Sequence, residues 1–418
     1  MIRPISDPRV WNSVRWLYMG SGVLFLANIS LGILNVFTPG ALPRGQLLAH
    51  FHAGTIGWIT LGIIATATWV FTAGRDVGPK VPRFVAGFTV VAVLAVAGYI
   101  AAFGLAFNGD GPFWLLPLFG IPSWLVILTA TVFVGMQFRS QAVVTTTHLL
   151  FFGALVVASL GATMGVLWGL SYSTGSYPGP SGTNGIGAHA APMEMYMGLA
   201  FAGLAEILVG GNEAKRWTKP GMAQAALAVG GGFLASLALY ANLGPVIPLS
   251  LLLFLVSFGI YFSRIGWRTF KVNPFQPGRS AAVFWGGLAY PIHIIAFVLL
   301  VAIYFVPGRE LPHAYGVVFA HIAFIGAGTN FLLATQSAYG DRGAPPSRWQ
   351  AVAHWTQNVG MLAFFAGELV AGRREGALLM AAGVLGGLFI VWSRLGASWH
   401  PPQEPAVEAQ PPSMPPPA

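Results

Sequence analysis

The sequence predicts an all-α integral membrane protein, a bundle of twelve transmembrane helices with both termini in the cytoplasm. Of 418 residues, 55% are hydrophobic and only 8% are charged, whereas ordinary soluble domains carry about 25% charged residues. Apolar stretches of about 20 residues, the length that crosses a bilayer as a helix, occur twelve times. The basic residues gather in alternate loops. These observations define the fold class.

The twelve expected spans follow one another through residues 1–398, and we expect no soluble domain. The first span has no small-residue cleavage site after it, so we expect a retained helix rather than a signal peptide. The uncharged loop 171–187 should be irregular, and the proline-rich segment 399–418 should be a disordered cytoplasmic tail. The expected spans cover residues 15–37, 46–72, 83–106, 113–137, 143–170, 187–210, 221–242, 246–263, 281–306, 313–336, 350–371 and 375–395.

The loop charges support this count independently. With the N-terminus inside, all 21 basic residues except Arg44, Arg309, Arg373 and Arg374 fall on the cytoplasmic side. A wrong number of helices would exchange the sides of all later loops. The net charge of +9 therefore reflects topology, and we expect no nucleic-acid partner. We expect the protein in the cytoplasmic membrane of a bacterium or an archaeon.

The chain has no cysteine. This excludes disulfides, thiolate metal sites, iron-sulfur clusters and haem attached covalently through cysteine. Any metal must be held by histidine, methionine, tyrosine or carboxylate side chains.

Histidines lie inside several expected spans, where an ionisable side chain is costly and usually functional. His50 and His52 begin the second span, His189 the sixth, and His313 and His321 the tenth. All three spans enter the membrane from outside, so these five histidines lie in its outer half.

His50 and His52 point about 200° apart on a helix, so one ligand can use only one of them. His52 is the deeper of the two and is followed by Gly54 and Gly57, which leave room for a flat macrocycle. His321 likewise precedes two glycines, at 326 and 328. We therefore expect His52 and His321 to be the two axial ligands of one six-coordinate haem.

The remaining histidines have simpler interpretations. A histidine near a helix end is usually interfacial or hydrogen-bonded, and we interpret His50, His148, His313, His354 and His400 in this way. For His189 and for His293, in the middle of the ninth span, metal ligation and a hydrogen-bonding role are both open.

Two carboxylates lie in the sixth span. Glu194 follows His189 by five residues in the outer half, where burial would raise its pKa, and it is the candidate proton donor. Glu206 lies near Glu213 and Lys215, so we expect it at a solvated helix end.

Two segments resemble the catalytic subunit of nitric oxide reductase, a branch of the haem-copper oxidase superfamily. HIAFIGA at 321–327, continued by Asn330, Leu333, Ala334 and Tyr339, resembles the tenth helix, and AHFHAGTIGWITL at 49–61 resembles the second. The resemblance implies a twelve-helix fold and a low-spin haem b held by His52 and His321. His189, Glu194 and Glu206 are similar in kind to the residues of the family's sixth helix, although the spacing from histidine to glutamate differs by one residue. A second resemblance, to the haem- and copper-containing NnrS membrane family, rests on the His-x-His start of the second helix.

The chain departs from the oxidase pattern at two places. The family's ligand to the high-spin haem lies two residues before the low-spin ligand, where this chain has Phe319. The family's seventh helix carries a histidine pair for the second metal, and residues 221–242 contain no histidine. The usual binuclear centre is therefore absent or rebuilt. His189, His293 and His313 are the residues that would rebuild a copper or non-haem iron site.

Three functions follow. The first is a haem-b membrane protein that transfers electrons from quinol or cytochrome c, or that reduces or senses a small gas such as NO or O2. The second is a haem-free transporter, for which Pro291 and Gly230 to Gly232 would interrupt helices near a substrate site. The third is a structural subunit of a larger redox complex, with which Phe319 is compatible.

Overall fold

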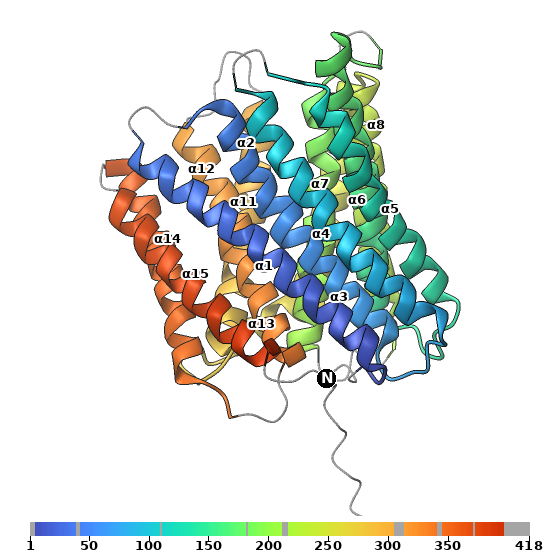
Figure 1. The fold of residues 1–418 in the computed structure, drawn as a ribbon, viewed down its shortest axis with the longest axis vertical. Coiled ribbons are helices and arrows are strands. Elements are labelled where there is room, and N and C mark those ends of the chain that lie inside the picture. The colour runs from blue at the N-terminus through green and yellow to red at the C-terminus, as the bar shows by residue number, and fades with distance from the viewer. Residues whose placement is uncertain are drawn as a thin grey trace, which may run out of the picture.

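The computed structural model describes residues 5–38, 42–108, 111–180, 183–210, 216–304, 313–340, 345–370 and 373–396. Throughout these residues the chain is helical, with no β-strand (Figure 1). The expected tail 399–418 lies outside the described residues.

Long helices follow the expected spans to within a few residues. In chain order the elements are α1 (Pro8–Phe37), α2 (Arg44–His52), η1 (Ala53–Thr60), α3 (Leu61–Thr72), α4 (Lys80–Ala106), α5 (Leu115–Phe138), α6 (Thr146–Thr174), α7 (Gly185–Val209), α8 (Lys219–Tyr240), η3 (Gly244–Val246), α9 (Ile247–Tyr261), η4 (Phe262–Gly266), α10 (Trp267–Thr269), α11 (Ser280–Tyr304), α12 (His313–His321), η5 (Ile322–Thr329), α13 (Asn330–Gly340), α14 (Arg348–Val370) and α15 (Arg373–Gly396).

Within the described residues, eleven helical segments are long and apolar enough to cross a membrane. The protein is therefore an integral membrane protein. The remaining expected span corresponds to α14, which is 23 residues long but less apolar. Four of its polar side chains are buried, Gln350, His354, Gln357 and Asn358. Asn358 exchanges two hydrogen bonds with Asn330 of α13, at 2.9 and 3.1 Å. This internal pairing explains how a less apolar helix packs inside the bundle.

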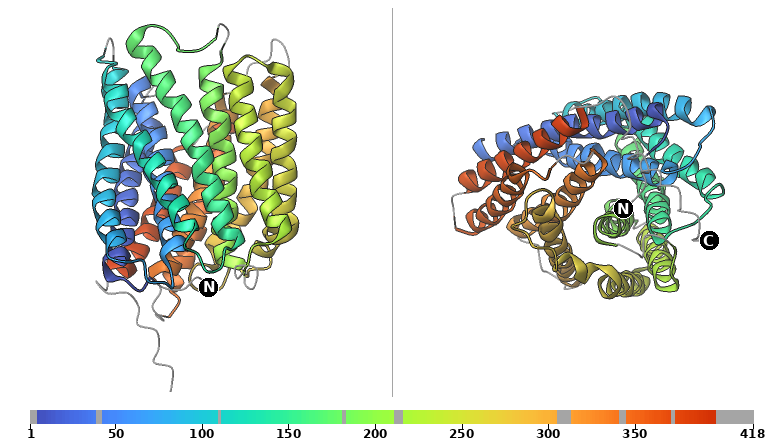
Figure 2. Two further views of the ribbon diagram at one scale, coloured as in Figure 1. Left: turned by 90° about the vertical axis from the view of Figure 1, so that its right-hand side faces the viewer. Right: turned by 90° about the horizontal axis from the view of Figure 1, so that it is seen from below.

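The start of α1 and the end of α15 lie at the same face of the bundle. The Arg15 guanidinium, near the start of α1, donates to the carbonyl of Leu395 at the end of α15 (3.3 Å). We call this the proximal face, and the opposite face, where α2, α7 and α12 begin, the distal face (Figures 1 and 2). The helices alternate in direction between them. Arg44, Arg373 and Arg374 begin helices at the distal face, and which face is cytoplasmic stays a prediction.

Three segments form the centre of the bundle. In the most apolar 18 residues of each segment, 89% of residues are buried in Arg44–Thr72, 72% in Gly185–Val209 and 67% in Ala314–Gly340. In each of the other eight membrane-length segments, 50% or less of the corresponding residues are buried. The second, sixth and tenth expected spans are thus central, and the other helices surround them (Figure 2). These central segments carry His50, His52, His189, Glu194 and His321.

Two central segments share an unusual backbone. In each, a nine-residue α-helix ends at a histidine, His52 or His321, and an eight-residue π-helix follows before the α-helix resumes. Each π-helix ends at a threonine whose hydroxyl donates to the carbonyl five residues earlier, Thr60 to Thr55 and Thr329 to Phe324. π-Helical turns are rare and cluster at functional sites.

Candidate functional site: two cavities, each with a pair of histidines

Three cavities lie around the three central segments. One lies between α2 and α7, one between α7 and α12, and one between α12 and α2. The first contains His52 and His189, the second contains Phe319, and the third contains His50 and His321. Glu194 lines both the first and the second. We name them the His52–His189 cavity, the Glu194 cavity and the His50–His321 cavity. Phe51 lines all three.

The His50–His321 cavity has a volume of about 470 Å³ and lies among α1, α2, α12, α14 and α15. Its walls are mainly aliphatic, with Phe364 in ring contact with His321 (5.0 Å between centroids). Glu368 and Arg373 line it as well, and they form an ion pair of 3.3 Å. Gly32 faces the imidazole of His50, and a Cβ at that glycine would lie 2.9 Å from the ring. Glycine is therefore required there for the ring to fit.

Each imidazole of this cavity is held in place through its own Nδ1 atom. Nδ1 of His50 lies 2.8 Å from the carbonyl oxygen of Asn28 on α1, and Nδ1 of His321 lies 2.8 Å from the carbonyl oxygen of Val317. A carbonyl only accepts, so each Nδ1 carries the proton and each Nε2 presents a lone pair. Histidines that bind metals are usually oriented in this way, by a carbonyl on the nitrogen that does not bind.

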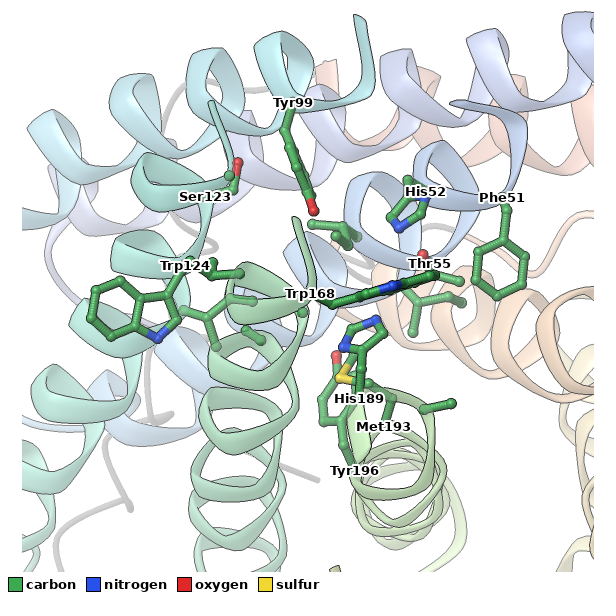
Figure 3. Close-up of a pocket in the computed structure, with 18 of the residues that line it drawn as sticks. Phe51, His52, Thr55, Tyr99, Ser123, Trp124, Trp168, His189, Met193 and Tyr196 are labelled. Carbon is green, nitrogen blue, oxygen red and sulfur yellow. The ribbon is translucent and has the colours of Figure 1, made fainter. Parts of the chain in front are cut away.

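The His52–His189 cavity has a volume of about 380 Å³, and a recess of about 30 Å³ shares both histidines with it. Figure 3 shows the two imidazoles directed into the cavity, with the indole of Trp168 seen edge-on between them in this view and the hydroxyl of Tyr99 pointing inward.

The same orientation recurs in this second pair. Nδ1 of His52 donates to the carbonyl of Leu48 (2.8 Å), and Nδ1 of His189 donates to the carbonyl of Gly161 on α6 (2.7 Å). The ring of His52 also stacks on Phe103 at 3.8 Å. Gly165 faces His189, and a Cβ there would lie 2.9 Å from its Nδ1. All four histidines thus direct Nε2 away from the carbonyl that holds them.

The structure pairs the histidines differently from the sequence prediction. His52 and His321 were expected to face each other, but they line different cavities, and the residue that shares a cavity with His321 is His50. His50 was interpreted as interfacial because it is shallower than His52. The opposed directions of His50 and His52 were predicted correctly, but depth does not determine which of them faces α12.

The Glu194 cavity, about 340 Å³, contains no histidine pair. Oε2 of Glu194 lies 2.9 Å from Nε2 of His293 on α11. Phe319 packs on the ring of His293 with centroids 4.8 Å apart. Within the part of the chain that the structure describes, no three histidine or carboxylate side chains lie close enough to hold a metal ion. Metal ligation by His189 or His293 stays a prediction.

Other predicted polar residues have different outcomes. Glu206 was expected at a solvated end but is 0% exposed, because Arg264 of η4 binds both carboxylate oxygens, at 2.9 and 3.2 Å. His148 is hydrogen-bonded at the start of α6, as predicted, through Thr145. His354 is fully buried rather than interfacial. The side chain of His313 and all of His400 lie outside the described residues.

The comparisons with known proteins do not assign a family. No protein-family model matches the chain, and no curated protein matches its sequence.

Proposed function

We propose that the protein is a haem-b membrane cytochrome that transfers electrons, with His50 and His321 as the axial ligands of the haem. The observation that carries the proposal is the pair of imidazoles in one apolar cavity, each held at Nδ1 and each with Nε2 left for a ligand. A volume of about 470 Å³ lies in the range of pockets that bind small molecules and cofactors, about 300 to 1,000 Å³.

A porphyrin fits this donor set better than a free metal ion does. Protein-bound zinc and copper ions generally need three or four protein ligands, and the described residues bring no third histidine or carboxylate into such a group. A porphyrin supplies four nitrogens itself and requires only the two axial positions from the protein. Two imidazoles in one cavity could supply these two ligands.

The residues around the pair define the environment. Asn28 donates to the carbonyl of His50 (2.6 Å) while its own carbonyl accepts from the ring, so that α1 fixes the position of α2. Arg373, 35% exposed at the distal face, presents a cation toward the cavity, which suits the propionate groups of a haem. When bound, the haem iron gains and loses one electron between its ferric and ferrous states.

Imidazole at both axial positions favours electron transfer over gas binding, because no iron position is left open. Reduction or sensing of NO or O2 would need the Glu194 cavity, where Phe319 supplies no ligand. Glu194 stays our candidate proton carrier, since His293 holds it inside the bundle. We place the protein in a bacterial or archaeal cytoplasmic membrane, with quinol or cytochrome c as the electron donor.

Haem content of the purified protein tests the proposal. We expect a Soret band, haem b in the pyridine haemochrome assay, and loss of one haem per chain in both His50→Ala and His321→Ala. His148→Gln is the matched control, because His148 is also a buried histidine but caps α6 near the proximal face; it should keep the full haem content. A wild-type protein without haem, purified from cells that make it abundantly, would contradict the proposal.

A further inference from the structure

The His52–His189 cavity is not used by the proposed function. It nevertheless repeats the features of the His50–His321 cavity: two imidazoles from different central helices, carbonyls holding both Nδ1 atoms, and a glycine facing one ring. His52 is only 8% exposed, and no protein group among the described residues is hydrogen-bonded to its Nε2. A buried imidazole fixed in this way is prepared for a ligand.

We propose that the cavity binds a second haem, with His52 and His189 as its axial ligands, so that the chain holds two bis-histidine haems on opposite sides of α2. The inference rests on the proposed function, because it assigns the same kind of cofactor to a second site. The argument against a free metal ion is also the same. No third histidine or carboxylate among the described residues completes a coordination shell.

The walls of the cavity suit a flat aromatic ligand. Tyr99 and Trp168 line both the cavity and its recess. The ring centroid of Trp168 lies 6.5 Å from His189 and 5.8 Å from Tyr172. A macrocycle between the two imidazoles would require this indole to turn aside and stack on it, whereas His52 is fixed by its stacking on Phe103 at 3.8 Å.

A cation lies at the mouth of this cavity as well. The guanidinium of Arg44 donates to the hydroxyl of Tyr172 (3.3 Å) and lies over the ring of Phe107 (5.1 Å). Both of those rings line the recess. Arg44 thus corresponds to Arg373 at the other cavity, and two of the four basic residues that depart from the predicted charge asymmetry stand where haem propionates would emerge.

Two haems at these sites would be neighbours. Their ligands His50 and His52 are two residues apart, and Phe51 between them lines both cavities. The π-helix that begins at Ala53 follows directly. One short segment of backbone would therefore connect the two sites, which is the arrangement expected of an electron-transfer pair.

The test is a count of haem in four variants, with metal analysis on the same samples. We expect two haems per chain in the wild type and one in each of His52→Ala, His189→Ala, His50→Ala and His321→Ala. The haem kept in His52→Ala and His189→Ala also shows that these variants fold. One haem that depends on His321 but not on His189 would overturn the second site and leave the proposed function standing, and no haem at all would overturn both.

A ligand exchange gives a readout that a structural role of His189 would not. In His189→Met the second haem should be kept, with its midpoint potential raised, because methionine ligation raises haem potentials. The potential of the His50–His321 haem should change little. An unchanged pair of potentials, or copper or zinc bound without haem through His52 and His189, would overturn the inference.

Discussion

Nε1 of Trp58 donates to Oγ1 of Thr329 at 3.0 Å, and this bond joins the two π-helices, η1 and η5. The same threonine hydroxyl donates to the carbonyl of Phe324. Each of the two residues is 0% exposed. Because His52 and His321 immediately precede these π-helices, the contact fixes the relative position of the two segments that carry three of the four candidate ligands.

Thr329→Val should therefore destabilise the protein. The substitution keeps the shape but removes the acceptor of a buried indole N–H, and an unsatisfied buried donor costs about 1 to 3 kcal/mol. Thr329→Ser, which keeps the hydroxyl, is the matched control. Thermal unfolding in detergent, followed by circular dichroism, should show a lower midpoint for Thr329→Val alone. Equal midpoints for both variants would show that the bond contributes nothing to stability.

The buried ion pair of Glu206 and Arg264 gives a second prediction. Glu206→Gln removes the negative charge that binds the Arg264 guanidinium, and only 7% of the Arg264 side chain is exposed. Breaking a buried pair in this way costs about 3 to 5 kcal/mol, whereas replacing both partners costs much less. The double variant Glu206→Gln with Arg264→Gln should recover part of the stability in the same measurement. A double variant less stable than Glu206→Gln would contradict this explanation.

The sequence was sufficient to predict the long helices, because span length and apolar composition are local properties. It did not predict which histidines line the same cavity, because this depends on how each helix is rotated about its axis, and the π-helices after His52 and His321 change that rotation. The contact between Arg264 and Glu206 could not be predicted for a similar reason, because the two residues are 58 positions apart in the sequence and lie on different helices. One signal was present but unused: the arginines at 44 and 373, which depart from the predicted charge asymmetry.

Charge near the His50–His321 cavity should tune the haem potential. Reduction adds an electron, so a nearby cation favours the reduced form. A unit charge at roughly 10 Å with an effective dielectric constant of about 20 contributes about 1.7 kcal/mol. Arg373 is 35% exposed, so solvent screening should reduce the effect to a few tens of millivolts.

In a spectroelectrochemical titration, Arg373→Gln should therefore lower the midpoint potential of this haem. Glu368→Gln, which removes the opposite charge of the same ion pair, should raise it. Shifts of the same sign in the two variants would be incompatible with an electrostatic origin. Arg44→Gln serves as the control, because Arg44 lies at the other cavity and should affect this haem less.

Phe319→His should create a metal site in the Glu194 cavity. The wild-type side chain packs 4.8 Å from the ring of His293, and His293 already contacts Glu194 at 2.9 Å. An imidazole at position 319 would add a third ligand to these two, which reaches the minimum that proteins use for a zinc site with one open position.

We expect about one Zn²⁺ or Cu²⁺ per chain of the Phe319→His variant above the wild-type level after dialysis. Phe319→Tyr is the control for a change of polarity without an imidazole, and the combination of Phe319→His with His293→Ala should lose the metal again. If Phe319→His binds no more metal than Phe319→Tyr, an imidazole at position 319 does not reach Glu194 and His293.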